Sequence, residues 1–212
     1  MKVLKFGGTS VADADAIRRV VAIVADERRT AATAGTVVVV SALGGVTDQL
    51  LEVAALARRG DAPHALALVD ALRSRHVATL AAFVADKGAG ARDAVEALFS
   101  QLRAIVGAVA VLHEASPRSL DAIAAIGELA SSRIVTAAMA AAGLPVTWAD
   151  PRALIVTDEN FTAATPQIDA TAAQTAAHLR PSLDRGRVVV TGGYVGATPR
   201  GIIRHCMFCS PR

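Results

Sequence analysis

The sequence predicts an α/β fold built on a mainly parallel sheet, and three observations support this. Hydrophobic residues make up 53% of the 212 residues but aromatic residues only 3%, so the apolar content is aliphatic, as where helices pack on a parallel sheet. Residues 36–40 form a continuous β-branched run, which is typical of a strand buried on both faces. Glycine pairs follow three expected strands, at 7–8, 44–45 and 192–193. The length is sufficient for one globular domain.

The spacing of apolar residues gives the order of the elements. We expect a strand at 2–6, a helix over about 13–30, a strand at 36–40 and a helix from about residue 46. Between about 62 and 142 the spacing predicts three long amphipathic helices, interrupted at 87–90 and 116–117. A strand at 145–148, a short strand at 154–157, a helix over about 169–184 and a strand at 187–191 follow. A helical block is therefore expected inside an α/β pattern.

Composition and charge argue against several classes of function. The apolar runs are shorter than the roughly 18 residues that a membrane span needs, and Lys5, Gly7 and Gly8 interrupt the start before a signal peptide could form. We therefore expect a cytoplasmic protein. The net charge of +3 comes from scattered arginines, which disfavours a nucleic-acid-binding surface. Cys206 and Cys209 form a lone C-x-x-C near the end, which cannot complete a zinc site, so no metal site is expected.

The three glycine pairs predict one shared crevice. In open α/β sheets, ligands bind outside the carboxyl ends of the strands, where all three pairs lie. A glycine pair between a strand and a helix lets the backbone approach a phosphate and offers its N–H groups as donors, and Lys5 adds a positive charge. Such glycines are also common in plain tight turns, so this pattern alone leaves the structural interpretation open.

Four longer motifs occur along the chain, and their order is informative. They are Lys5-Phe6-Gly7-Gly8-Thr9-Ser10-Val11-Ala12, Val39-Val40-Ser41-Ala42-Leu43-Gly44-Gly45-Val46-Thr47-Asp48, Gly127-Glu128-Leu129-Ala130-Ser131-Ser132-Arg133 and Val190-Thr191-Gly192-Gly193-Tyr194-Val195-Gly196-Ala197. Together they resemble the ordered motifs of aspartate kinases, with the long helical insertion of the lysine-sensitive, single-function type. The resemblance runs from residue 1 to about 199. It implies a three-layer α/β/α sandwich with a mainly parallel sheet, of the amino-acid-kinase type, truncated at its C-terminal side.

The resemblance also implies roles for six residues. Lys5 would bind and neutralise the transferring phosphoryl group of ATP, supplied with Mg²⁺, while Gly7 and Gly8 donate N–H groups and Ser41 lies nearby. Thr47 would bond a carboxylate of L-aspartate, and Glu128 would pair with its ammonium group. The product would be 4-phospho-L-aspartate, the first step towards lysine, threonine and methionine. No general base is needed, because the β-carboxylate of aspartate is already an anion at neutral pH.

Simpler interpretations stay open for some of these residues. Thr47 is also suited to cap the following helix. Glu128 lies in an otherwise apolar helix and needs a partner, for which Arg133 or Arg118 are alternatives to a ligand. Four histidines show no consistent partner spacing and are expected to be structural or solvated: His64, His76, His113 and His178.

The resemblance ends at about residue 199. The family continues with a Gly-Arg-Gly-Gly-Ser-Asp segment, strands around the adenine and C-terminal ACT domains, whereas residues 200–212 form an unrelated tail, which we attribute to a frameshift or a truncated gene. The alternative to a working kinase is thus a non-catalytic remnant, or a docking partner of an intact kinase. An amino-acid kinase acting on glutamate or uridylate is a further alternative. Missing strands would expose a sheet edge near 187–191, through which the chain could pair or form a homo-oligomer.

Overall fold

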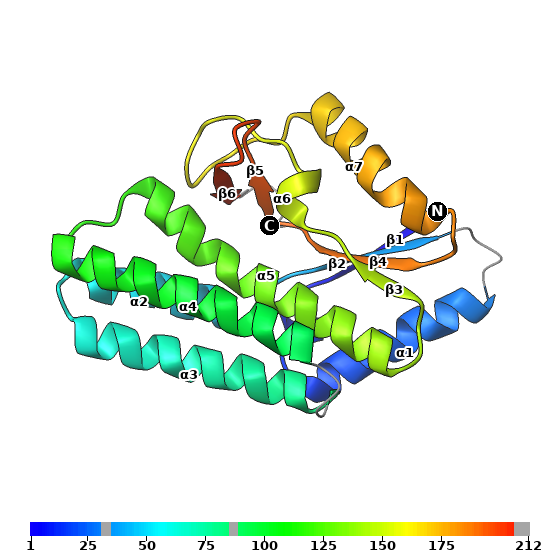
Figure 1. Ribbon diagram of the computed structural model, residues 1–212, viewed down its shortest axis with the longest axis horizontal. Coiled ribbons are helices and arrows are strands. Elements are labelled where there is room, and N and C mark those ends of the chain that lie inside the picture. Colours follow the sequence, from blue (N-terminus) through cyan, green and yellow to red (C-terminus); the bar gives the residue numbers. More distant parts are fainter. Residues whose placement is uncertain (31–34, 85–88, 206–212) are drawn as a thin grey trace.

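A four-stranded parallel sheet organises the fold in the computed structural model, which describes residues 1–30, 35–84 and 89–205 (Figure 1). Its strands are β1 (Lys2–Phe6), β2 (Thr36–Val40), β3 (Val146–Trp148) and β4 (Val188–Gly192), in the order β1-β2-β4-β3. All three neighbouring pairs run parallel. Phe6 is level with Val40, and Val40 with Gly192, so the carboxyl ends of the first three strands in this order meet at one edge.

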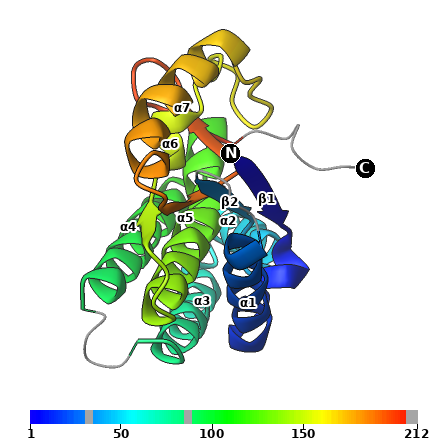
Figure 2. The ribbon, with the colours of Figure 1, turned by 90° about the vertical axis from the view of Figure 1, so that its right-hand side faces the viewer.

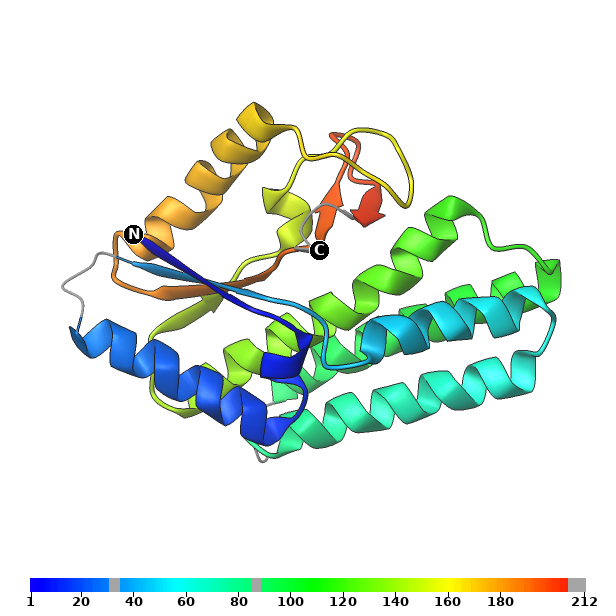
Figure 3. The same cartoon turned by 180° about the vertical axis from the view of Figure 1, so that it is seen from behind.

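Helices cover both faces of this sheet, very unevenly (Figures 1 and 3). One side carries α1 (Ala14–Thr30), α2 (Val46–Arg58), α3 (Ala62–Ala81), α4 (Ala89–Leu112) and α5 (Pro117–Ala141). The other side carries α6 (Pro151–Leu154) and α7 (Ile168–Leu183). A short 3-10 helix, η1 (Gly8–Val11), follows β1, and β5 (Val195–Ala197) pairs antiparallel with β6 (Ile203–His205). Seen along the sheet, the α7 side and the bundle side lie on opposite sides of the strands (Figure 2).

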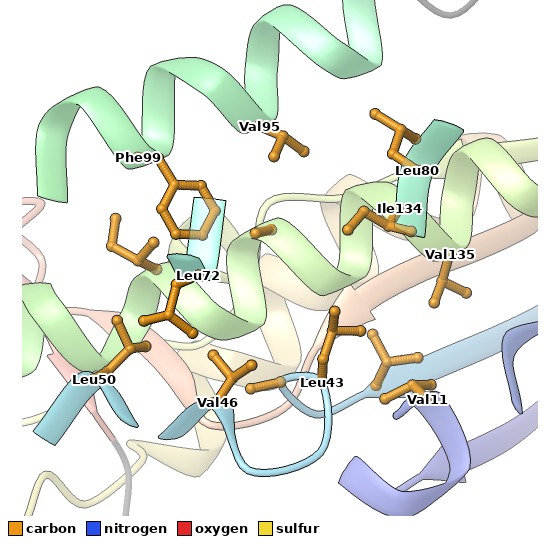
Figure 4. Packing of buried hydrophobic residues seen from close by; sticks show 14 of the residues in the cluster. Val11, Leu43, Val46, Leu50, Leu72, Leu80, Val95, Phe99, Ile134 and Val135 are labelled. Carbon is orange, nitrogen blue, oxygen red and sulfur yellow. The ribbon is translucent and has the colours of Figure 1, made fainter. Parts of the chain in front are cut away.

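Alternate residues of β2 and β4 point to opposite layers. Val38 and Val190 belong to the large core cluster that contains side chains from α1 to α5 (Figure 4). Val37 and Val189 instead pack with Leu179 and other side chains of α6 and α7. This alternation follows from the period of two in a strand, and it requires apolar residues at every position when both faces are covered. The three-layer α/β/α arrangement with a parallel sheet is therefore confirmed.

The long helices of the bundle pack mainly on one another. α5 begins at Ser116, whose hydroxyl accepts from the N–H of Ser119 at 3.2 Å, with Pro117 in the first helical position. It contacts α2, α3 and α4 as well as the sheet, and most of its residues are buried. The segments 90–112 and 117–141 are long and apolar enough to cross a membrane. That is weak evidence of a span, because the buried core helices of soluble proteins meet the same criterion.

Two expectations from the sequence are wrong. The first residue of the short strand expected at 154–157, Leu154, is instead the last residue of α6, because Asp150 caps the N–H of Arg152 at 3.0 Å and Pro151 starts the helix. Only single bridges, from Val156 to Ala197 and from Thr157 to Pro166, remain of that strand.

The exposed edge expected near 187–191 is not an edge, because β4 lies between β2 and β3. Val188 to Gly192 are all buried. In the described part of the chain the free edges are β1 and β3, and on β1 the side chain of Val3 is 55% exposed. The interruption expected at 87–90 lies largely outside the described residues, whereas the one at 116–117 is confirmed by the start of α5.

Candidate active site

The three glycine segments meet at the carboxyl edge of the sheet. A side chain on Gly8 would stand 3.3 Å from the carbonyl oxygen of Ala42, and one on Gly44 would stand 3.0 Å from Cβ of Ala12. A side chain on Gly193 would stand 2.8 Å from Cγ1 of Val39. The backbone can come this close only because glycine lacks a Cβ, and this close packing holds the turn after β1 against the turn after β2. The three glycine segments thus lie together at one edge of the sheet, and of the three pairs only Gly192 and Gly193 line the groove found there.

Lys5 projects from the end of β1 towards the α7 side of the sheet. Its ammonium group lies 3.5 Å from the hydroxyl oxygen of Tyr194 and 5.4 Å from the centre of the Tyr194 ring. Gly7 precedes η1 in an extended conformation, and a side chain there would meet no atom within 4 Å. The backbone beside Lys5 is therefore open, as binding of an anion at the start of η1 would require.

Ser41 and Thr47 flank the second glycine turn. The N–H of Ser41 donates to the carbonyl of Phe6 at 3.2 Å, and its carbonyl accepts from the hydroxyl of Ser131 at 2.6 Å, which ties β2 to α5. Thr47 is half-buried in the first turn of α2, and no hydrogen bond of its hydroxyl occurs among the described residues. The cap position is Gly45, with φ of +76°, so the alternative role of Thr47 as the cap is wrong. The hydroxyl of Thr47 thus has no structural task in this helix start.

Glu128, on α5, is a deeply buried carboxyl group of the site, with 3% exposure. Its Oε2 accepts from the N–H of Tyr194 at 2.7 Å, and the backbone N–H groups of Gly193 and Val195 also favour the ionised carboxylate. Burial raises the pKa of Glu128 to about 7, against the effect of these three N–H groups and of the Lys5 charge. The site therefore holds a carboxyl group that can gain or lose its proton near neutral pH.

The expected partner of Glu128 is thus the backbone after β4 rather than an arginine. Arg133 instead stacks on Trp148, with its guanidinium 3.7 Å from the ring centre. Gly192 makes the contact with β4 feasible, because a side chain there would stand 2.7 Å from Oε2 of Glu128. The third and fourth sequence motifs therefore contact each other in the folded chain, through Glu128 and the segment from Gly192 to Tyr194.

Arg75 is a structural part of the site that the sequence did not reveal. From α3, its guanidinium donates to the carbonyl of Ala12 at 3.0 Å and to the carbonyl of Gly44 at 2.8 Å. It therefore links the segment after η1 to the second glycine turn. Nothing in the local sequence distinguishes Arg75 from the other helical arginines, since its partners lie 63 and 31 residues away.

A groove of about 980 Å³ leads from the site along the α7 side of the sheet. Lys5, Gly192 and Gly193 line one end, and Val3, Val39 and Leu179 are among the apolar residues that line the rest. The groove exists because α7 covers β4 but leaves much of β1 and β2 uncovered on this side. The cation and the glycine turn thus stand at the mouth of a large apolar groove.

The histidines offer no metal site. His76 is fully buried, its Nδ1–H donates to the carbonyl of Leu72 at 2.7 Å and its ring packs on Phe99, while His64 pairs with Asp61 at the start of α3. Within residues 1–30, 35–84 and 89–205, no three His, Cys, Asp or Glu side chains gather as metal ligands would. The two cysteines at 206 and 209 lie outside the described residues.

A parallel sheet with glycine turns, a lysine at the end of β1 and a buried carboxyl group at the same edge define an α/β protein with a candidate site at the carboxyl ends of its strands. The chain belongs to the amino acid kinase family, whose model matches residues 1–210. The lysine-sensitive aspartokinase 3 of Escherichia coli is 31% identical over 199 residues, and the aspartokinase of Chlamydia trachomatis is 32% identical over 199 residues. Each alignment covers 94% of this chain and 41% of the relative.

A solved structure agrees with these sequence relatives. E. coli aspartokinase III in complex with aspartate and ADP superposes with a TM-score of 0.84 at 30% identity, covering 97% of this chain and 43% of that chain. The resemblance to aspartate kinases is therefore confirmed. The chain spans about two fifths of the length of these relatives and corresponds to their N-terminal part.

Proposed function

We propose that this chain carries the aspartate-binding and phosphoryl-binding half of an aspartate kinase site, acting in the cytoplasm. The reaction is transfer of the γ-phosphoryl group of ATP to the β-carboxylate of L-aspartate, which gives 4-phospho-L-aspartate. One observation carries the proposal: Lys5 and Glu128 lie at the same edge of the sheet, close enough for the Lys5 charge to act on the Glu128 carboxyl group. The site thus offers a cation for the phosphoryl group and a carboxylate for the substrate ammonium.

Glu128 suits recognition of an ammonium group. An ionised carboxylate has about four acceptor positions, and the N–H of Tyr194 occupies one of them at 2.7 Å. Acceptor capacity is left for the α-ammonium of aspartate, whose charge would also hold Glu128 in the ionised state. The hydroxyl of Thr47, unused within the helix, would donate to a carboxylate of the substrate. Backbone support of Glu128 fixes the position of the substrate relative to Lys5.

Lys5 and the glycine turns would act on the phosphoryl group. The β-carboxylate of aspartate is an anion at neutral pH and attacks without a general base. Catalysis then consists of placing the carboxylate in line with the γ-phosphate and neutralising the charge that spreads over its oxygens. We assign the neutralising role to Lys5 and the N–H donor roles to Gly7 and Gly8, with Ser41 beside them.

ATP with Mg²⁺ is the proposed phosphoryl donor. The open backbone at Gly7 and the missing side chain at Gly8 fit an approaching phosphate. Mg²⁺ supplies charge neutralisation on the phosphates when it is bound. Since the described residues gather no ligand cluster for a metal, the ion would be held through the phosphates of the nucleotide.

A second candidate function is docking to another polypeptide without catalysis. Its support is the free edge of β1, where Val3 is 55% exposed and Met1 is 75% exposed beside the apolar groove. An unpaired edge strand offers its N–H and C=O groups to a strand of a second chain. Pairing at β1, with another copy or with an intact kinase, therefore replaces the pairing at 187–191 that the sequence suggested.

Calorimetric titration with Mg-ATP and with L-aspartate, run beside an aspartyl-hydroxamate assay, tests the two functions. We expect the folded chain to bind L-aspartate, and we expect Glu128→Gln to weaken this binding at least about tenfold through loss of the ion pair. Lys5→Met should abolish the response to Mg-ATP, whereas Lys2→Met, on the same strand but paired with Glu27, should leave it unchanged. Binding without hydroxamate would favour docking to a chain that completes the site. A folded chain that binds neither compound would refute the kinase proposal.

A further inference from the structure

A second, smaller hollow of about 210 Å³ lies away from the glycine turns, between α4, α5 and the segment from β3 to α6. Arg133 and Leu129 line it from α5, Leu98 and Gln101 from α4, and Trp148 and Arg152 from the third side. Lys5, Glu128 and the glycine pairs do not line it. Its volume suits a small molecule of a few heavy atoms rather than a nucleotide.

Arg133 is held in this pocket by stacking rather than by an anion. Its guanidinium lies 3.7 Å from the ring centre of Trp148, and the indole N–H of Trp148 donates to the hydroxyl of Ser132 at 2.9 Å, which fixes the ring. Among the described residues no oxygen accepts a hydrogen bond from the Arg133 guanidinium. A half-buried guanidinium has five N–H donors, so this group is available to an acceptor that enters the pocket.

The charges around the pocket do not balance. Arg152 is bonded to Asp150, with Nε 2.9 Å from Oδ1 and 3.0 Å from Oδ2. Asp150 also attracts Arg133, while Arg152 repels it, and burial lowers the pKa of Arg133. Two guanidinium groups thus share one carboxylate, which leaves one positive charge uncompensated in a partly desolvated place. An anion that contacts Arg133 would relieve both the repulsion and the missing hydrogen bonds.

We propose that this pocket binds a small oxyanion, a carboxylate or a phosphate, through the guanidinium of Arg133 with support from Arg152. A planar guanidinium matches two oxygens of either group in a bidentate contact, and its stacking on Trp148 orients it beforehand. Small or apolar side chains line much of the rest of the pocket: Ala94, Ala97, Leu98 and Leu129. They leave room for a short aliphatic body, so an organic carboxylate gains contacts that inorganic phosphate lacks.

Trp148 is the only tryptophan of the chain and therefore reports on the pocket directly. We would titrate the full chain with sodium butyrate and, separately, with sodium phosphate, following tryptophan fluorescence and the heat of binding, with sodium chloride at matched ionic strength as the reference. We expect a saturable change with at least one oxyanion, at concentrations where chloride has no effect. Butyrate binding tighter than phosphate would identify the ligand as an organic carboxylate, and the reverse order would identify a phosphate.

Variants separate this site from general attraction of anions. Arg133→Met should lower the affinity for the anion at least tenfold. Arg133→Lys should lower it less, because lysine keeps the charge but loses the bidentate contact. Arg103→Met is the matched control, since Arg103 is on the same helix bundle but pairs with Asp70 at 2.7 Å on its surface. No saturable response of the wild-type chain to either anion overturns the proposal, as does an equal loss in Arg103→Met. The wild-type titration decides even if Arg133→Met fails to fold.

Discussion

Replacing His76 with leucine should change how the stability of the protein depends on pH. His76 is completely buried, and burial lowers its pKa from 6.5 to about 4, against the hydrogen bond to Leu72. In the unfolded chain the same side chain takes up a proton near pH 6.5. Between pH 6.5 and 4 the unfolded state therefore binds more protons, so acid favours unfolding. A shift of 2.5 units at 1.36 kcal/mol per unit corresponds to about 3 kcal/mol of stability, present above pH 6.5 and lost by about pH 4.

Urea unfolding of wild type and His76→Leu at several pH values measures this contribution. The difference in unfolding free energy between the two proteins should be constant above pH 7, fall by about 2 kcal/mol at pH 5 and by about 3 kcal/mol near pH 4. Taking the difference removes the contributions of all groups that both proteins share. A difference that does not change with pH would refute the claim that His76 is held uncharged in the core.

Three further predictions concern the site. The raised pKa of Glu128 stabilises the folded state in acid, so the unfolding free energy of wild type should fall by about 3 kcal/mol as the pH rises from 4.5 to 7. Glu128→Gln should lack this pH-dependent change, and urea unfolding over this range checks it. Arg75→Met should cost about 1–3 kcal/mol and speed amide exchange at the two linked turns, whereas Arg73→Met, which breaks an exposed pair with Glu96, should cost less than about 1 kcal/mol. Gly192→Ala should destabilise by about 1–3 kcal/mol by pressing on the Glu128 carboxylate, while Gly107→Ala, in open space on α4, should not destabilise; thermal unfolding that ranks them equally would contradict this.

The parts of the fold that depend on local pattern were predictable from the sequence. The β-branched run at 36–40 and the valines at 188–190 are strands because only a residue set that is apolar at every position fits between two helical layers. The 3.6-residue spacing located α1, α3, α4, α5 and α7 to within a few residues. The position of β4 between β2 and β3 was not predictable, because the residues of a strand do not show which other strands it pairs with.

The residues of the candidate site were likewise predictable where a local pattern marks them and not where their partners are distant in the sequence. Lys5, Gly7 and Gly8 were found because they stand at the end of the first strand, and Ser41 was found through the motif that contains it. Sheet geometry then brings all four to one edge. The motif singled out Glu128, but the apolar helix around it suggested an arginine partner, whereas the N–H of Tyr194 bonds to it. A partner of this kind cannot be identified from the sequence, because every residue except proline carries a backbone N–H group. Arg75 escaped notice for a related reason: its two carbonyl partners are main-chain atoms of distant turns. The roles assigned to the site residues in binding and catalysis stay predictions.

The position of β4 has a consequence for how the molecule is made. Thr36 of β2 is level with Val188 of β4, a residue that leaves the ribosome 152 positions later. At about 5–20 residues per second, β2 waits about 8–30 s for its second neighbour, and α2 to α7 are synthesised in that interval. During that interval one edge of a strand of four valines lacks its partner, and pairing across so large a sequence separation is slow. The residues of the helical bundle are all synthesised before β4, so we expect the bundle to cover one face of β2 before the sheet closes.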